Sequence, residues 1–330
     1  MMDQSLASGA PAGPLNAEWR AVLRRQKYQI VGSHSAVKKC RWLHESLVRD
    51  RVCYKQSFYG INSHRCIQMT PSLICNMRCR FCWRVQPEDI GIREPIPPPR
   101  VWDGPEGIVE GCLSAQRRIL SGYKALATSG RIDGRKYSEA LEPRHVAISL
   151  DGEPTLYPEI GGLLEAFRNR GFTTFLVTNG TVPSAIAGLE AEPTQLYVSA
   201  YAPDEEGYGA ICNPRSRRAW RDFLETLELL HSLKCPTVLR MTLVKGLNMA
   251  DARGWAELIE RASPTYVEAK AYMYVGYSRL RLSFENMPTF EEVMGFASEL
   301  AGMTSYGLIG ESRDSRVALL SELEEPIKIS

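Results

Sequence analysis

The sequence predicts an α/β fold, a partial (βα)6 barrel with N-terminal and C-terminal extensions. Apolar runs rich in β-branched residues alternate with helical patterns from residue 65 onward. Such alternation is typical of parallel strands joined by right-handed crossover helices. Six such runs suit a partial barrel better than a closed eight-stranded one. The chain has 330 residues, 44% of them hydrophobic, which is enough to bury a core of that size.

The predicted elements follow one another in a regular order. An amphipathic helix is expected over residues 17–28, ahead of the barrel. The expected strands are residues 65–70, 145–150, 173–178, 195–200, 237–243 and 266–274. The expected helices are residues 106–123, 158–170, 184–189, 216–233 and 250–262, followed by a helix at 287–301 and a late strand at 317–320. The chain thus divides into a disordered tail (1–14), an N-terminal extension (15–64), a barrel core (65–285) and a C-terminal extension (286–330).

Composition limits the classes of function. A net charge of +2 is too small to indicate a nucleic-acid partner by itself. No stretch has the length of a membrane span, and the first residues lack the layout of a signal peptide, so we expect a cytoplasmic protein without a membrane partner. The nine cysteines are an odd number. In a chain without a targeting signal this favours metal ligation over a disulfide framework.

Cys75, Cys79 and Cys82 form a CxxxCxxC motif directly after the first expected strand. Thiolates are soft ligands for iron, and three of them leave one iron of a [4Fe-4S] cluster open. The motif resembles that of radical S-adenosylmethionine (SAM) enzymes, in which the open iron chelates SAM and a 5'-deoxyadenosyl radical is released. Phe81 matches the aromatic residue usual near the adenine. The alternatives are three buried thiols or a zinc site, although zinc usually needs a fourth ligand.

A second motif, Gly152, Glu153 and Pro154, follows the next expected strand. It is similar to the GEP-type motif that usually binds the methionine ammonium of SAM in that superfamily. Taken alone, Gly-Glu-Pro is a turn before a helix. Three more candidates for SAM binding stand at the ends of later strands, and each is either a cofactor contact or an ordinary cap. They are Asn179, Ser199 and Asn248.

A second set of cysteines, Cys40, Cys53 and Cys66, is spaced by twelve residues each time. This spacing does not match whole helical turns, so loops must bring the thiols together. They are either buried apolar residues or the ligands of a second three-thiolate cluster. Lys55 follows Cys53 by two residues. It is either a surface charge or, in a dry pocket, an amine whose pKa falls far enough to form a Schiff base.

From about residue 28 onward the chain resembles one family closely, the tRNA 4-demethylwyosine synthases, which are radical SAM enzymes of wyosine and wybutosine biosynthesis. The resemblance runs through "CRWLHESL", "CYKQSFYGI", "SLICNMRCRFCWR", "ALEPRHVAISLDGEPTLYP" and "LRMTLVKGLNM". The doubled cysteine spacing, with a lysine two places after the middle cysteine, is far more specific than CxxxCxxC alone.

The resemblance implies a role for each candidate group. It implies a SAM-binding [4Fe-4S] cluster on Cys75, Cys79 and Cys82, and an auxiliary [4Fe-4S] cluster on Cys40, Cys53 and Cys66. It implies that Lys55 forms a Schiff base with pyruvate, the two-carbon donor. The implied reaction converts N1-methylguanosine at position 37 of tRNA-Phe into 4-demethylwyosine. The chain has no room for the flavodoxin-like domain of eukaryotic members, so it resembles the shorter archaeal form and we expect an external electron donor. We also expect a monomer.

The tRNA must present residue 37 unstacked at the barrel mouth. The best candidate for phosphate contacts is "NPRSRRAWR", whose arginines accompany Trp220. Asp151, where serine is common, and Phe290, where histidine is common, depart from the family pattern and bear on substrate positioning only. The alternatives are another two-cluster radical SAM enzyme acting on a small molecule or peptide, and a non-catalytic Fe-S or zinc protein that binds RNA.

Overall fold

A single ten-stranded sheet forms the centre of the fold in the computed structural model, which describes residues 15–92 and 96–329. The expected tail at residues 1–14 lies outside the described residues. The strands run in the order β1-β2-β3-β4-β5-β6-β7-β8-β10-β9. They are β1 (Tyr28–Val31), β2 (Ser35–Lys38), β3 (Cys66–Thr70), β4 (His145–Ile148), β5 (Thr173–Thr178), β6 (Gln195–Ala200), β7 (Thr237–Leu243), β8 (Tyr266–Ala271), β9 (Gly307–Ser312) and β10 (Val317–Ser321).

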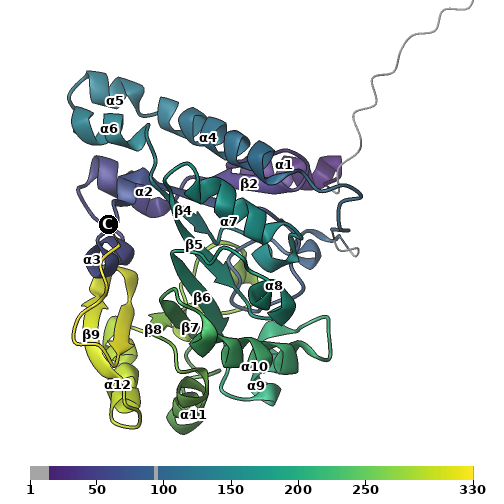
Figure 1. The fold of residues 1–330 in the computed structure, drawn as a ribbon, viewed down its shortest axis with the longest axis vertical. Coiled ribbons are helices and arrows are strands. Elements are labelled where there is room, and N and C mark those ends of the chain that lie inside the picture. Colours follow the sequence, from purple (N-terminus) through teal and green to yellow (C-terminus); the bar gives the residue numbers. More distant parts are fainter. Residues whose placement is uncertain (1–14, 93–95, 330) are drawn as a thin grey trace, which may run out of the picture.

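The six strands from β3 to β8 are parallel to one another, whereas β1, β2, β10 and β9 pair antiparallel at the two edges. Helices between the parallel strands lie outside the curved sheet, and α12 lies beside β9 (Figure 1). The predicted partial (βα)6 barrel is thereby confirmed. No helix within residues 15–92 and 96–329 has the length and apolarity needed to cross a membrane.

Helices precede the barrel, connect its strands and follow it. Those before and within the first crossover are α1 (Ala17–Arg25), α2 (Arg41–Val48), α3 (Tyr54–Tyr59), α4 (Pro105–Ser121), α5 (Lys124–Thr128) and α6 (Gly134–Ala140). The later ones are α7 (Ile160–Arg168), α8 (Pro183–Ala187), α9 (Glu205–Cys212), α10 (Ala219–Leu229), α11 (Ala252–Ala262) and α12 (Phe290–Ala301).

The predicted strands at residues 173–178, 195–200 and 237–243 are confirmed to the residue. The first helix is shorter than predicted. It ends at Arg25 because Lys27 takes a left-handed conformation with φ 66°, and the chain enters β1 at Tyr28. The hairpin of β1 and β2 escaped prediction because its two four-residue strands depend on pairing with each other and with β3, and a pattern so short carries little signal.

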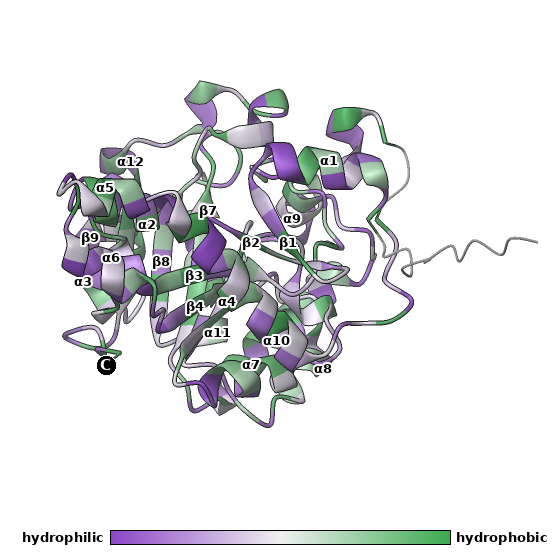
Figure 2. Ribbon diagram, turned by 90° about the horizontal axis from the view of Figure 1, so that it is seen from above, coloured by the Kyte–Doolittle hydropathy of each residue, from purple (hydrophilic) through white to green (hydrophobic). Residues whose placement is uncertain are grey.

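The two faces of the sheet carry different cores. Leu239 and Met241 of β7 pack outward with the helices in the larger apolar cluster. Side chains of the opposite parity, such as Phe175, Tyr197 and Val238, form a second cluster that also includes aromatic residues of α3. Seen from above and coloured by hydropathy, the strands are mostly apolar, whereas hydrophilic and hydrophobic residues alternate along the surrounding helices (Figure 2). The short helix α3 therefore closes the inner face of the barrel.

Candidate functional site

The loop that follows β3 carries Cys75, Cys79 and Cys82, and all three line one pocket together with Gly152 and Arg84. The three thiols lie close to one another because they line the same pocket. Burial raises the pKa of Cys75, and the charges of Cys79 and Cys82 raise it further. The loop is held from its far side by backbone hydrogen bonds that α9 accepts. Arg78 N donates to Cys212 O, and Arg80 N donates to Ile211 O, both at 2.9 Å.

Gly152 fixes how the loop after β4 meets the cysteine loop. Its φ is +64°, and a Cβ at this position would lie 2.0 Å from Ser72 O and 2.6 Å from Ile74 O. The close approach allows Glu153 N to donate a 2.7 Å hydrogen bond to Ile74 O. Only glycine satisfies both the backbone conformation and the contact. Pro154 then begins a short 3-10 turn at residues 154–156.

The substitution Gly152→Ala is expected to destabilise the protein by about 1–3 kcal/mol more than a glycine replacement in open space. It is also expected to lower the iron content, because the clashing carbonyls belong to the cysteine loop. Denaturant unfolding and iron assay measure both effects. The matched control is Gly91→Ala, which shares a positive φ of +75° but meets nothing within 4 Å. Equal stability and equal iron in the two variants would contradict this prediction.

Glu153 is buried, with 2% exposure, and its carboxylate is anchored unequally. Oε1 accepts hydrogen bonds from Thr155 N (3.0 Å), Thr155 Oγ1 (2.6 Å) and Thr178 Oγ1 (2.6 Å). Oε2 accepts one, from Asn179 N at 2.8 Å. Burial raises the pKa of Glu153, and these hydrogen bonds act in the opposite direction. Because a carboxylate oxygen accepts more than one hydrogen bond, Oε2 keeps capacity for an ammonium donor.

The other SAM candidates contact residues of the cysteine loop or of the loops at the ends of the later strands. Asn179 Nδ2 donates to Asn76 Oδ1 in the cysteine loop at 2.9 Å. The Asn248 amide donates to Tyr201 O (2.7 Å) and Thr242 O (2.8 Å) and accepts from Val244 N (2.7 Å), so it ties the loop after β7 to the end of β6. Phe81 packs against Tyr201, with ring centroids 4.9 Å apart. Burial raises the pKa of Tyr201 well above its ordinary value, and Ser199 acts in the opposite direction.

The structure also brings together the second set of cysteines. Cys40 is the N-cap residue of α2, Cys53 is the N-cap residue of α3, and Cys66 is the first residue of β3. Burial raises the pKa of Cys53 to about 12, with a further increase from Cys40. Burial also raises the pKa of Cys66, and the charges of Cys40 and Cys53 add to this. The three thiols are therefore mutual neighbours, as the loop hypothesis requires.

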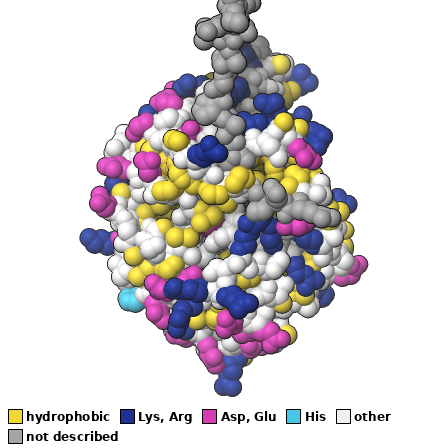
Figure 3. Space-filling view, turned by 90° about the vertical axis from the view of Figure 1, so that its right-hand side faces the viewer, with side chains coloured by type: hydrophobic (Ala, Val, Ile, Leu, Met, Phe, Trp, Pro, Cys, Tyr) yellow, Lys and Arg dark blue, Asp and Glu magenta, His cyan; other side chains and the backbone are white. Residues whose placement is uncertain are grey.

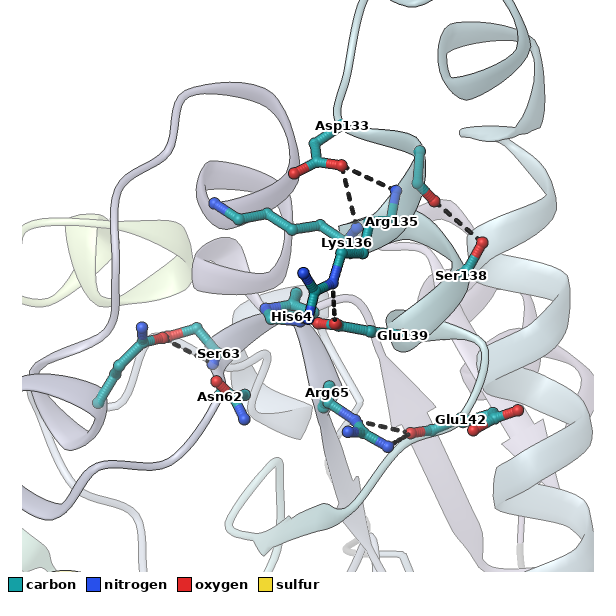
Figure 4. A network of polar contacts seen from close by, with 12 residues as sticks. Asn62, Ser63, His64, Arg65, Asp133, Arg135, Lys136, Ser138, Glu139 and Glu142 are labelled. Carbon is teal, nitrogen blue, oxygen red and sulfur yellow. Dashed lines mark hydrogen bonds and ion pairs between the residues drawn. The ribbon is translucent and has the colours of Figure 1, made fainter.

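A polar network holds the turn that precedes Cys66 (Figure 4). Ser63 Oγ accepts a 2.9 Å hydrogen bond from Cys53 N, so this turn also orients the second cysteine. His64 Nε2 lies 2.8 Å from Glu139 Oε2 on α6, and the Arg65 guanidinium donates to Glu142 O at 2.8 and 3.0 Å. Two of the three thiols are thus positioned by a shared framework that reaches to α6.

Lys55 lies on α3 beside these thiols and has 8% exposure. Its Nζ atom is buried and lacks a hydrogen-bond partner within the described part of the chain. It sits 3.4 Å from the centroid of the Tyr197 ring and 4.4 Å from that of Phe175. Burial lowers the pKa of Lys55 to about 7, so a large fraction of this amine is neutral and nucleophilic near neutral pH.

Sequence reasoning missed the charged residues inside the barrel. Glu268 is fully buried and accepts hydrogen bonds from the hydroxyls of Tyr54 (3.0 Å) and Tyr59 (3.2 Å). Arg240 of the neighbouring strand lies 3.8 Å from it. Lys270 is the second lysine whose pKa burial lowers to about 7. The available signal was charge at alternate positions of otherwise apolar strands, which places these side chains on one face.

Both cysteine groups fit a thiolate-bound cluster, since every described cysteine is a free thiol and each set of three converges. Within residues 15–92 and 96–329, no three His, Cys, Asp or Glu side chains meet at a distance suited to one shared metal ion. A four-iron cluster is ligated at separate corners and does not require the sulfurs to meet at one point.

Comparisons with known proteins agree with this geometry. Residues 134–259 match the radical SAM superfamily, and residues 261–322 match the family described as wyosine base formation. SAM-dependent tRNA 4-demethylwyosine synthases from Pyrococcus abyssi and Methanocaldococcus jannaschii are 49% and 47% identical to the chain. Each alignment covers 91% of this chain, with 87% of the first relative and 94% of the second.

Solved structures give the same result. A structure of TYW1 with a lysine-pyruvate adduct bound has a TM-score of 0.84 and 43% identity, covering 95% of this chain and 99% of that one. The crystal structure of an archaeal TYW1 has a TM-score of 0.77 and 40% identity over the same shares.

Proposed function

Because the chain belongs to the tRNA 4-demethylwyosine synthase family of radical SAM enzymes, we propose that it converts N1-methylguanosine-37 of tRNA-Phe, with pyruvate, into 4-demethylwyosine. The observation that carries this proposal is the buried amine of Lys55, which has no hydrogen-bond partner among the described residues and lies beside a trio of thiols. The solved relative with a lysine-pyruvate adduct supports a matching role for this lysine.

Membership in the superfamily implies SAM and one [4Fe-4S] cluster as cofactors. We propose Cys75, Cys79 and Cys82 as its ligands, and Glu153 as the acceptor for the SAM ammonium. When bound, the cluster and SAM supply the 5'-deoxyadenosyl radical that takes hydrogen from the N1-methyl group of the substrate. Glu153 is suited to its role because Oε2 retains acceptor capacity while Oε1 is saturated. The remaining proposed contacts of SAM are Gly152, Pro154, Phe81, Asn179, Ser199 and Asn248.

We also propose an auxiliary [4Fe-4S] cluster on Cys40, Cys53 and Cys66. The convergence of three buried thiols from three separate elements supports it. Buried thiols that are not ligands need no such convergence, as Cys112 illustrates, because burial is its sole pKa perturbation. Three thiolates leave one iron of the cluster open, next to the lysine that would carry pyruvate.

Lys55 performs the covalent step. Its neutral amine attacks the ketone carbon of pyruvate, a C–N bond forms, and the carbonyl oxygen leaves as water, giving an imine. The carbon radical left on the substrate adds to this imine carbon. The bond between carbons 1 and 2 of pyruvate then breaks, which re-forms the imine, and carbon 1 leaves with the unpaired electron as a carbon dioxide radical anion. The exocyclic amine of the guanine then displaces Lys55 by transimination, which closes the third ring and restores the free lysine.

Anaerobic incubation with N1-methylguanosine-containing tRNA, SAM, dithionite and labelled pyruvate tests the function. The nucleoside product, followed by mass spectrometry, should retain label from carbons 2 and 3 of pyruvate and none from carbon 1. Reductive SAM cleavage without tRNA product would favour a different radical SAM substrate. Stable zinc with no SAM cleavage would favour a non-catalytic RNA-binding protein. We further propose that the protein is a cytoplasmic monomer without a membrane partner and that it uses an external electron donor.

The tRNA surface is expected around the segment between α9 and α10. A hollow there is lined by Arg215, Arg217, Trp220 and Tyr208, among others. This segment touches the cysteine loop, because Arg215 N donates to Asn76 O at 3.0 Å. Lysine and arginine side chains also gather around apolar ones on the face at the right of Figure 1 (Figure 3). Tyr208 is buried, whereas Trp220 is partly exposed. Arginine beside an accessible aromatic ring suits single-stranded RNA.

The double substitution Arg215→Glu and Arg217→Glu is therefore expected to raise KM for tRNA about tenfold and to flatten its salt dependence. SAM cleavage without tRNA should not change, since neither arginine is proposed to contact SAM. The control is Arg117→Glu on α4, an exposed arginine on another side of the fold. A KM for tRNA that responds equally to both changes would indicate a nonspecific charge effect and would argue against this surface.

A further inference from the structure

A row of polar side chains crosses three neighbouring strands inside the barrel. Ser199 of β6 is the register partner of Arg240 on β7, and Arg240 is the register partner of Glu268 on β8. The two neighbours of Arg240 in sequence, Leu239 and Met241, pack with the outer helices. Because side chains alternate along a strand, Arg240 points to the opposite, inner face.

Arg240 is incompletely paired at this position. Its side chain is 25% exposed, and the carboxylate nearest to it is Glu268, with 3.8 Å between Nε and Oε2. That distance exceeds a hydrogen bond. Glu268 is already bonded to the hydroxyls of Tyr54 and Tyr59. Within the described part of the chain, the Arg240 guanidinium donates no hydrogen bond. Its five N–H donors, fixed in a planar fork, are therefore open to a ligand.

The charges around Arg240 favour an anionic ligand. Arg240 acts on two further basic side chains inside the barrel, Lys55 and Lys270, and Glu268 is the acidic residue that acts on both lysines. A partly buried arginine is normally matched by an anion, and its planar fork fits the two oxygens of a carboxylate.

Arg240 also lies between the two halves of the proposed site. Its charge reaches Tyr54 and Tyr197, which surround Lys55, and it reaches Tyr201, which packs on Phe81 of the cysteine loop. Two carboxylates enter the reaction of the proposed function, that of the keto acid and that of SAM.

We propose that Arg240 anchors a substrate carboxylate inside the barrel, and that the keto acid is the carboxylate it holds while Lys55 attacks the neighbouring carbonyl carbon. The assignment rests on the proposed function, because it presumes an imine at Lys55. It makes Arg240 the residue that selects a keto acid over an uncharged ketone.

Reductive trapping tests this anchor without tRNA or radical chemistry. Cyanoborohydride supplies hydride to the imine, and intact-protein and peptide mass spectrometry report the adduct at Lys55. Pyruvate is compared with its uncharged methyl ester in the wild type, Arg240→Gln and Arg240→Lys. We expect Arg240→Gln to lower the ratio of pyruvate to ester trapping about 10- to 100-fold. The ratio is the readout because the charge of Arg240 also lowers the pKa of Lys55, and its loss changes the reactivity of the amine toward both compounds alike. Arg240→Lys should recover part of the preference, since it keeps the charge and loses the fork.

Equilibrium binding of SAM to the cluster-loaded variants distinguishes the two carboxylates. Weaker SAM binding with an unchanged ratio of pyruvate to ester would assign the anchor to SAM and overturn the keto-acid assignment. An unchanged ratio together with unchanged SAM affinity would overturn the anchor itself. If Arg240→Gln fails to fold, as judged by circular dichroism, the ratio measured for Arg240→Lys decides. If the wild type itself forms no adduct, the proposed imine at Lys55 is contradicted. This outcome concerns the proposed function, and SAM affinity can still be compared between the wild type and the Arg240 variants.

Discussion

Replacing Lys55 with alanine is expected to reduce 4-demethylwyosine formation at least about a thousandfold while reductive SAM cleavage remains measurable. The amine is the nucleophile of the proposed imine, and no other group on α3 can replace it. The cysteine loop lies at the other end of β3, so radical generation does not depend on this side chain. Nucleoside mass spectrometry and chromatography of 5'-deoxyadenosine measure the two activities side by side.

The fold should survive this change because, within residues 15–92 and 96–329, the Lys55 amine has no hydrogen-bond partner that would be left unpaired. Lys270→Met is the matched variant, since burial lowers the pKa of both lysines to about 7. The Lys270 amine donates to Ser315 O and is thereby occupied. Trapped pyruvate should therefore still map to Lys55 in Lys270→Met. Product from Lys55→Ala at the wild-type rate would rule out the imine.

The substitution Cys66→Ala is expected to lower the iron content from about eight to about four atoms per chain and to abolish tRNA product. SAM cleavage should persist, because the proposed ligands of the SAM cluster are untouched. Iron assay and electron paramagnetic resonance of the reconstituted protein give a readout independent of activity. The loss follows from the shared position of the three thiols, since Cys40 raises the pKa of Cys53 and both of them raise the pKa of Cys66.

The matched control for this change is Cys235→Ala. Cys235 is a free, partly buried cysteine outside both groups, and its backbone N–H donates to Glu192 at 2.7 Å regardless of the side chain. It should keep all of the iron. Equal iron in Cys66→Ala and Cys235→Ala would contradict the auxiliary cluster and leave a single cluster per chain.

The barrel was predictable from sequence because its parallel strands are buried on both faces and read as continuous apolar runs. The strand at residues 195–200 is an example, with every residue buried. The edge strands were not predictable on the same basis. β9 carries exposed and half-buried residues throughout, and it forms by pairing with β10. Its sequence contains two glycines and has no alternation that would mark a strand.

The spacing of the cysteines in the sequence identified them as candidate ligands, whereas no such pattern identified the charged side chains inside the barrel. Glu153 and Lys55 sit in recognisable motifs, but Arg240 and Glu268 belong to two different strands that are separated in sequence by a helix. Their meeting depends on the register of β7 against β8, which local sequence does not specify. The same holds for Tyr54 and Tyr59, whose hydroxyls find Glu268 because α3 packs against the inner face of the sheet.

The length of β3 sets the separation between the two groups of cysteines. This strand begins at Cys66 and leads into the loop of Cys75, so one group of three cysteines lies at its start and the other follows its end. Five residues at about 3.3 Å each set an interval of roughly 17 Å along the strand. In the proposed function, this separation leaves room for the nucleobase at one end of the barrel and for the keto acid at the other. Inserting or deleting a single residue in β3 would change that interval and turn every following side chain to the wrong face.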